Sequence, residues 1–340
     1  MLDVTVLLLN DGYASTAINS IEVFQSAGVL WEELNGGTPE PRFRVTTASV
    51  DGRLTAPASP LTIRPRHAIA DIRKTDLIFV PAAGLDIDAM VHRYATLIAW
   101  LKRWHRRGVT IAGVCSGVPL LAEAGLLDDR PATAHWALVE DYRRRYPKIR
   151  WQPEYFVTGG DGVYCGGGLN AATDLSLHLV ERFCGHEVAT RTARAMLIDM
   201  PRVWQSGYAD LPLRIQHRDP KIEQAQQWLH ENFRQAGPFD TLALRIGMSP
   251  RNFTRRFKEA TGETPLAYLH GLRVNAAKRL LEEGRKSVQE VCSAVGYDDI
   301  IFFRELFRRH TGLSPKDYRE RFGQDSMTRA AVHGRPRLSA

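Results

Sequence analysis

The chain has 340 residues, of which 44% are hydrophobic and 24% are charged, an ordinary composition for a folded globular protein. This length exceeds what one compact core usually holds, so we expect two domains. No run of about eighteen apolar residues occurs, which argues against a membrane span. The four cysteines lack metal-ligand spacing, so we expect free thiols in a reduced cytoplasmic compartment, with no metal site and no cofactor.

The net charge of +7 is unevenly distributed along the chain. Residues 212–340 contain 23 Lys and Arg against 15 Asp and Glu, whereas residues 1–211 contain 22 against 23. A neutral first part followed by a basic last third suggests a nucleic-acid-binding module joined to something else. An ordinary solvated basic face gives the same asymmetry, so charge alone does not decide between the two.

Residues 1–200 alternate between strand and helix patterns. Short apolar or β-branched runs, typical of buried parallel strands, occupy residues 4–9, 43–49, 76–82 and 109–115. Helical patterns occupy residues 15–28, 86–108 and 169–185, and residues 155–167 read as two strands around a Gly-rich turn. This alternation predicts an α/β domain with a mostly parallel sheet sandwiched by helices.

Residues 201–220 hold three prolines and little periodicity, so we expect a linker there. Residues 221–322 have helical patterns throughout, and residues 323–340 have the composition of a disordered tail. The predicted N-caps of the helices are Asp240, Ser249, Thr264, Ser287 and Ser314. The glycines predicted to end them are Gly247, Gly262, Gly284, Gly296 and Gly312.

The helical part contains an internal repeat. FKEATGETPLAY (257–268) and FRRHTGLSPKDY (307–318) align at an offset of fifty residues. Each copy follows a short helix, a glycine and a second helix, which is the layout of a helix-turn-helix unit whose second helix enters the major groove. The pattern therefore predicts two such units joined by a long helix.

The second helix of the first unit, residues 249–262, has the side chains that read DNA. Phe253 and Phe257 define a buried face, which leaves polar and basic residues exposed. Arg suits guanine, Asn suits adenine, and Thr suits phosphate. The predicted DNA contacts of this helix are Arg251, Asn252, Thr254 and Arg255. The alternative for one such helix alone is a solvated basic surface.

The second helix of the second unit begins with four apolar residues, 300–303, more than one helix face can bury. Some of them must be exposed or touch DNA, for example at thymine methyl groups. Arg304 is a candidate base contact, whereas Glu305 either reads cytosine or weakens binding. This helix is expected to contribute positioning more than base reading.

Residues 221–322 resemble the AraC/XylS DNA-binding domain, most specifically in the pattern VGYDD…FFRELFRRHTGLSPKDYR. The resemblance implies sequence-specific binding at a promoter, with two reader helices in successive major grooves. Carried over by position, it assigns base contacts to Arg251, Thr254, Arg255, Ile301 and Arg304. Glu305 stands where many members have Arg, which leaves specificity there undetermined.

The stretch around Cys115 has the form of a nucleophile elbow, in which a strand turns sharply into a helix. The segment CSGVPLLAEAGLLDDRPATAHW (115–136) resembles the PfpI branch of the class I glutamine-amidotransferase-like fold. Together with the AraC-type domain this is the arrangement of the GlxA-like regulators. In catalytic relatives the cysteine works with a histidine, here His135, and with an acid that follows the first strand.

The acid is missing from this sequence. Thr16 stands where the family has a glutamate, Glu22 lies within the helix, and Asp11 is on the right loop at the wrong place. We therefore predict no catalytic residues and a chain that is not an enzyme. The alternative is a cysteine-dependent hydrolase or amidase with an attached DNA-binding domain.

Open α/β sheets bind ligands beyond the carboxyl ends of their strands. The residues expected to converge there on a small-molecule effector are Asn10, Thr16, Cys115, Ser116, His135 and Trp136. A Trp beside polar groups suits an amine or an amino-acid-like compound; the alternative for Trp136 is core packing.

The combined prediction is a ligand-responsive, sequence-specific transcriptional regulator. Its expected partners are promoter or operator double-stranded DNA, a small-molecule effector, a second copy of the chain and RNA polymerase, with no membrane. Activation is the habit of the resembled family. A third class, a non-specific nucleic-acid-binding protein, differs in that its DNA contacts read no bases.

Overall fold

A computed structural model describes residues 1–199 except 59, residues 205, 208 and 219–235, and residues 237–323. The chain divides into two compact units, Met1–Gln205 and Ser206–Ala340. Most of the predicted linker 201–220, and residues 324–340 of the predicted tail, lie outside the described residues. No described helix is both long enough and apolar enough to cross a bilayer.

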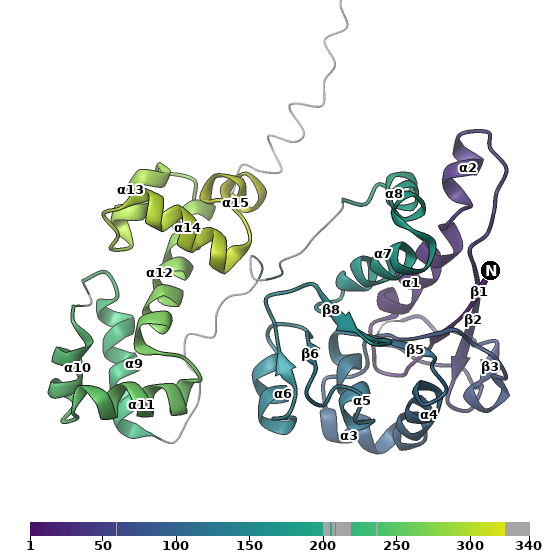
Figure 1. Cartoon of the computed structure of the whole chain (residues 1–340), viewed down its shortest axis with the longest axis horizontal. Helices are drawn as coiled ribbons and strands as arrows, with labels where there is room; N and C mark the ends of the chain where they lie inside the picture. Colours follow the sequence, from purple (N-terminus) through teal and green to yellow (C-terminus); the bar gives the residue numbers. More distant parts are fainter. Residues whose placement is uncertain (59, 200–204, 206–207, 209–218, 236, 324–340) are drawn as a thin grey trace, which may run out of the picture. The chain divides into compact units, whose positions relative to one another are not determined.

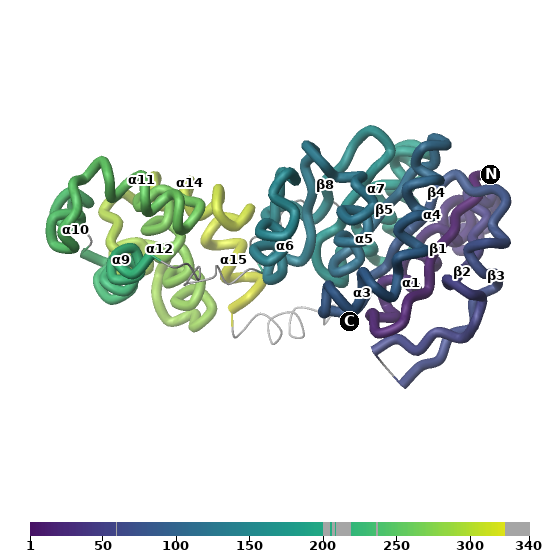
Figure 2. Tube along the Cα trace, turned by 90° about the horizontal axis from the view of Figure 1, so that it is seen from below, coloured from purple at the N-terminus to yellow at the C-terminus, as the bar shows by residue number. Residues whose placement is uncertain are grey.

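A seven-stranded sheet in the order β3-β2-β1-β4-β5-β9-β8 forms the centre of the first unit (Figures 1 and 2). Its strands are β1 (Leu2–Leu7), β2 (Phe43–Ser49), β3 (His67–Ala68), β4 (Leu77–Val80), β5 (Thr110–Val114), β8 (Val157–Gly160) and β9 (Val163–Gly166). All neighbouring pairs are parallel except β8 with β9. Two short strands, β6 (Pro131–Ala132) and β7 (Arg150–Trp151), pair separately. The predicted mostly parallel sheet is confirmed.

Helices cover both faces of this sheet (Figure 1). One face packs against α1 (Ala14–Ser26), α7 (Ala171–Cys184) and α8 (His186–Ala195). The other packs against α3 (Ile87–Arg93), α4 (Ala95–His105), α5 (Val118–Glu123) and α6 (Val139–Arg145). Leu77 and Phe79 point to the first face and Ile78 and Val80 to the second, because side chains alternate along a strand. A short helix α2 (Leu30–Leu34) and two 3₁₀ turns complete the unit.

The prediction of one helix over residues 86–108 was wrong. The chain forms α3 and α4 with a break at Tyr94, which has ψ 18°. The Tyr94 hydroxyl accepts a hydrogen bond from the Asn10 amide at 2.8 Å and donates to the Asn10 carbonyl at 3.2 Å. This long-range contact with the loop after β1 holds Tyr94 in place, and helical periodicity does not reveal it.

The second unit is helical, as predicted. Its helices are α9 (Pro220–Asn232), α10 (Phe239–Arg245), α11 (Pro250–Thr261), α12 (Pro265–Glu282), α13 (Val288–Ala294), α14 (Ile300–Thr311) and α15 (Pro315–Phe322). The side chains of Ser249, Thr264, Ser287 and Ser314 accept from backbone amides at the N-caps, as expected. Asp240 was wrong as an N-cap, because α10 already begins at Phe239.

The sequence repeat forms the same corner twice. Gly262 and Gly312 end α11 and α14 in the left-handed conformation, with φ of 79° and 76°. An N-capping residue, Thr264 or Ser314, and a proline at the first helical position follow each time, and they start α12 or α15 in a new direction. Tyr268 and Tyr318 then pack edge-on against Phe257 and Phe307, at 5.3 and 5.4 Å between ring centroids. The repeated letters therefore encode a helix stop, a turn and an aromatic contact.

The corner glycine of the elbow offers a test of the first unit. A Cβ at Gly117 would collide with the carbonyl oxygen of Pro81, although the backbone there, φ −80°, suits alanine. We expect Gly117→Ala to lower the free energy of unfolding by about 1–3 kcal/mol, as overpacking does. Urea denaturation measures the change.

Gly160→Ala is the matched control, because a Cβ there meets no atom within 4 Å. Equal urea midpoints for Gly117→Ala and the wild type would show that the elbow and the loop after β4 are not closely packed.

Candidate functional site

The elbow has the backbone conformation expected of it. β5 leads into Cys115, which has φ 55°, a left-handed conformation that costs energy for a residue with a side chain. A 3₁₀ turn, Cys115–Gly117, and α5 follow. The thiol is buried, with 3% of Cys115 exposed, and this burial raises the pKa of Cys115 to about 11. The cysteine is therefore a protonated thiol at neutral pH, which is a weak nucleophile.

The loops that follow β1, β4 and β5 pack directly on one another. The Ser116 hydroxyl donates to the carbonyl oxygen of Ala83 at 2.5 Å. Gly12 lies so close to the carbonyl of Ala82 that a Cβ would collide with it. The segment 81–84 after β4 is thus the point at which the other two loops meet.

Thr16 belongs to the same junction. It is fully buried, donates a hydrogen bond to the Tyr13 carbonyl at 2.7 Å and accepts one from the Ala82 amide at 3.0 Å. The hydroxyl therefore ties α1 to the loop after β4. Of the two other acids considered in its place, Glu22 is exposed on α1, and Asp11 lies beside Gly84 with its carboxylate paired with Arg93.

His135 is half-buried and its environment favours the neutral ring. Its Nδ1 accepts a hydrogen bond from the Ala137 amide at 3.2 Å, so the proton of the neutral imidazole resides on Nε2. Burial lowers the pKa of His135, which keeps the ring neutral. In this tautomer Nε2 donates hydrogen bonds and does not accept the proton of a thiol. The Trp136 ring lies beside it, with 5.4 Å between centroids, and Gly168 borders Nε2.

Five of the six predicted pocket residues form two groups, and the sixth, Cys115, is the buried elbow thiol. Asn10, Thr16 and Ser116 use their side chains to bind backbone groups of neighbouring loops, Asn10 by accepting from the Ala56 amide at 2.8 Å. His135 and Trp136 form a second group near Gly168. Convergence of all six on one ligand stays a prediction.

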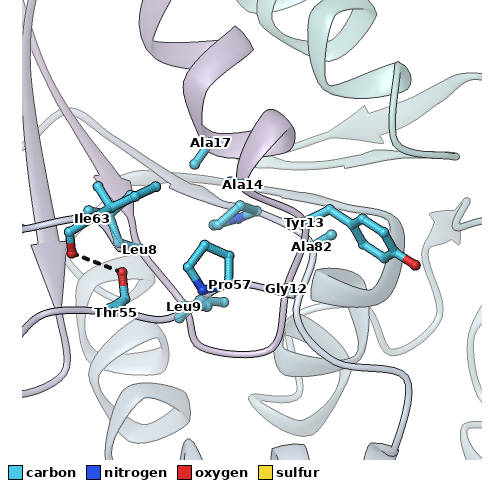
Figure 3. Close-up of a pocket in the computed structure, with 11 residues that line it drawn as sticks. Leu8, Leu9, Gly12, Tyr13, Ala14, Ala17, Thr55, Pro57, Ile63 and Ala82 are labelled. Atoms are coloured by element: carbon cyan, nitrogen blue, oxygen red, sulfur yellow. Dashed lines mark hydrogen bonds between the residues drawn. The ribbon is translucent and has the colours of Figure 1, made fainter. Parts of the chain in front are cut away.

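A small pocket lies next to the first group (Figure 3). Its lining comes from the loop after β1, the start of α1, residues 55–63 and the loop after β4, with Pro57 between Leu9 and Ala14. A volume of about 10 Å³ is no more than one water requires. The sequence did not single out Tyr13, Pro57 or Ile63, because no local pattern places residues 55–63 against the loop that follows β1.

In the second unit, α11 carries the predicted base-reading residues. Arg251, Thr254 and Arg255 are exposed, and Asn252 is half-buried. The Arg255 guanidinium donates to both carboxylate oxygens of Glu259 at 2.8 Å and to Asn252 Oδ1 at 3.0 Å. The Arg255 side chain, a predicted base contact, is therefore extended along the exposed face of α11 and pairs with Glu259, which sequence analysis did not single out.

The neighbouring Arg256 has a structural role. Its guanidinium forms two hydrogen bonds, of 2.9 and 2.7 Å, with the carboxylate of Asp219. Asp219 also caps α9, so this pair fastens the start of the unit to α11. The hydrogen bonds from Arg256 help to hold the pKa of the Asp219 carboxyl below its usual value, against the opposing effect of burial.

α14 exposes part of its apolar first turn, as predicted. Ile301 is 66% exposed and Phe302 is 44% exposed, whereas Phe303 is fully buried. Arg304 and Glu305 are exposed on the same helix. An exposed isoleucine next to an arginine is a surface that can meet thymine methyl groups and guanine.

Two known families match this chain, one in each of its two compact units. Residues 242–321 match the model of a helix-turn-helix domain, and residues 13–182 match the model of the DJ-1/PfpI family. The protein is a helix-turn-helix transcriptional regulator with an α/β domain fused in front of an AraC-type DNA-binding domain. Through that first domain, half of its length, the chain belongs to the DJ-1/PfpI family.

Similar proteins have the same arrangement. The HTH-type transcriptional regulator CdhR of Pseudomonas aeruginosa is 29% identical over 280 residues, 82% of each chain. GlxA of Rhizobium meliloti, also an HTH-type transcriptional regulator, is 27% identical and covers 83% of this chain and 87% of its own. A solved protein of Vibrio parahaemolyticus, 20% identical, covers 57% of this chain and 97% of its own with a TM-score of 0.50, which shows a shared fold.

The raised pKa of Cys115 predicts slow alkylation. At pH 8 a pKa of about 11 leaves about one thiol in a thousand ionised, so iodoacetamide should label Cys115 far more slowly in the folded than in the urea-unfolded chain. Raising the pH toward 11 should increase the rate. Peptide mass spectrometry reports each cysteine separately, with the half-buried Cys184 as internal control. Labelling of Cys115 at the unfolded rate would contradict the buried thiol.

Proposed function

We propose that this protein binds specific operator DNA through α11 and α14 and that a small molecule bound by its first unit controls this binding. The observation that carries the proposal is the duplicated helix-turn-helix unit. Each copy ends in the same Gly-Pro corner and exposes the face of its second helix. Two readers on one chain suit two successive major grooves.

Arg255 is the proposed principal base reader of α11. In the free protein its Nη1 donates to both carboxylate oxygens of Glu259 and its Nη2 donates to Asn252 Oδ1. Release of both partners would free two neighbouring donors for guanine O6 and N7. Binding would exchange Glu259 for a base, while Asn252, half-buried beside it, contacts adenine or the backbone. Arg251 and Thr254 complete this reader, and Ile301 with Arg304 forms the second.

We propose that the first unit senses and does not catalyse. Three features support this: the protonated Cys115 thiol, the His135 tautomer that presents a donor, and the use of Thr16 as a structural hydroxyl. The effector would be an amine or an amino-acid-like compound held near His135 and Trp136. We further propose that the protein acts in the cytoplasm as a homodimer and contacts RNA polymerase at the promoter.

Arg255→Ala tests the DNA reading. One bidentate arginine–guanine contact accounts for about 1–3 kcal/mol of discrimination, so the variant should lose specificity at a single base pair. Footprinting of DNA upstream of the neighbouring operon, followed by binding to single-base variants of the protected site, measures it. Arg279→Ala, an exposed arginine on α12, is the control. Equal weakening on every sequence would instead identify a non-specific nucleic-acid-binding protein.

Cys115→Ala separates a sensor from an enzyme. A sensor should keep operator binding, with at most an altered effector response, whereas a cysteine hydrolase would lose all turnover. Isothermal titration of the wild type with a panel of amines and amino acids, alongside assays for amide hydrolysis, measures both. Turnover that disappears in Cys115→Ala would overturn the sensor proposal, and absence of binding across the panel would overturn the effector class.

A further inference from the structure

The two helix-turn-helix units have separate hydrophobic cores that meet on α12. The first core extends from Ile222 on α9 to Leu272 on α12, and the second begins at Val274 on the same helix (Figure 1). Arg273 lies between these two residues. The junction of the two cores is thus marked by a charged side chain.

Arg273 contacts both helix-turn-helix units at once. Its Nε donates to the carbonyl of Phe233 at 2.9 Å, and Nη2 donates to the carbonyl of Arg234 at 3.4 Å, both just after α9. Its guanidinium lies 4.8 Å from the centre of the Tyr297 ring, in the turn between α13 and α14. One side chain therefore joins the segment after α9, which belongs to the first helix-turn-helix unit, to the turn before α14 in the second helix-turn-helix unit.

The surroundings of Arg273 leave little room for movement. Gly296, with φ +89°, lies so close to the carbonyl of Arg234 that a Cβ would collide with it, and the same Cβ would be 3.1 Å from Arg273 Nη2. One helical turn before Arg273, His270 Nδ1 forms a hydrogen bond of 2.6 Å with the Tyr297 hydroxyl. The turn that precedes α14 is consequently held against the first helix-turn-helix unit at two points, Gly296 and Tyr297.

We propose that Arg273 is a positioning residue that fixes α14 relative to α11 and thereby sets the spacing between the two base motifs of the operator. The inference rests on the proposed DNA reading. Two helices that enter successive grooves require motifs at a matching distance, since spacing is a geometric consequence of the protein. Without the clamp the two cores remain linked through α12, but the turn before α14 gains freedom and neighbouring spacings become acceptable.

Full-length protein and a randomised DNA duplex library test this without a known operator. The library is selected with the wild type, Arg273→Met, Arg273→Lys and the control Arg279→Met, and the bound DNA is sequenced. The wild type and Arg279→Met should recover two base motifs at one spacing. Arg273→Met should recover the same two motifs, with the preference for that spacing over a neighbouring one reduced about tenfold, the size expected from one charged hydrogen bond.

A role in stability alone would weaken both motifs and leave their spacing unchanged, so an unaltered spacing in Arg273→Met overturns the proposal. Arg273→Lys decides the matter if Arg273→Met does not fold, because lysine keeps the stem and the charge and lacks the planar fork. It should broaden the spacing as well, and a wild-type spacing with Arg273→Lys would count against the clamp. Failure of the wild type to select any motif refutes the DNA reading itself, a result separate from that of the variants.

Discussion

The close contact of three loops at the carboxyl end of the sheet determines what the first unit can do. Segment 81–84, after β4, forms hydrogen bonds with Thr16 and Ser116 and close backbone contacts with Gly12 and Gly117. These contacts pack the elbow against the loop after β4, and the hydroxyls of Thr16 and Ser116 are both bonded to backbone groups. The elbow of this chain is thus closely packed around a buried thiol.

The same packing gives Thr16 a structural role at a position where the resemblance to the PfpI branch predicts a glutamate. A carboxylate at this fully buried position would need compensating partners, because burial of an unpaired charge is costly. A threonine satisfies the two backbone groups within reach, the Tyr13 carbonyl and the Ala82 amide. Thr16 therefore links α1 to the loop after β4.

Local chemistry made much of the fold predictable from sequence. Alternating strand and helix patterns indicated the parallel sheet, and the repeated Thr-Gly…Pro…Tyr letters indicated both helix-turn-helix corners, because each letter has a local conformational reason. The break at Tyr94 and the partners of Thr16 were not predictable, since they depend on contacts between residues about 65–85 positions apart. The exposed positions on α11 and α14 followed from periodicity, whereas the pairing of Arg255 with Glu259 needed side-chain geometry.

In the second unit, apolar contacts and polar contacts have different roles. Each core contains Phe, Leu and Tyr side chains and stabilises one helix-turn-helix unit, but apolar packing is non-directional and tolerates small rearrangements. Hydrogen bonds from a planar guanidinium to two fixed carbonyls define direction as well as distance. In the proposed mode of DNA binding, the junction between α11 and α14 must fix their relative position precisely, because any displacement of α14 would also displace its contacts with the DNA. A charged clamp at the one place where the cores separate is suited to that requirement.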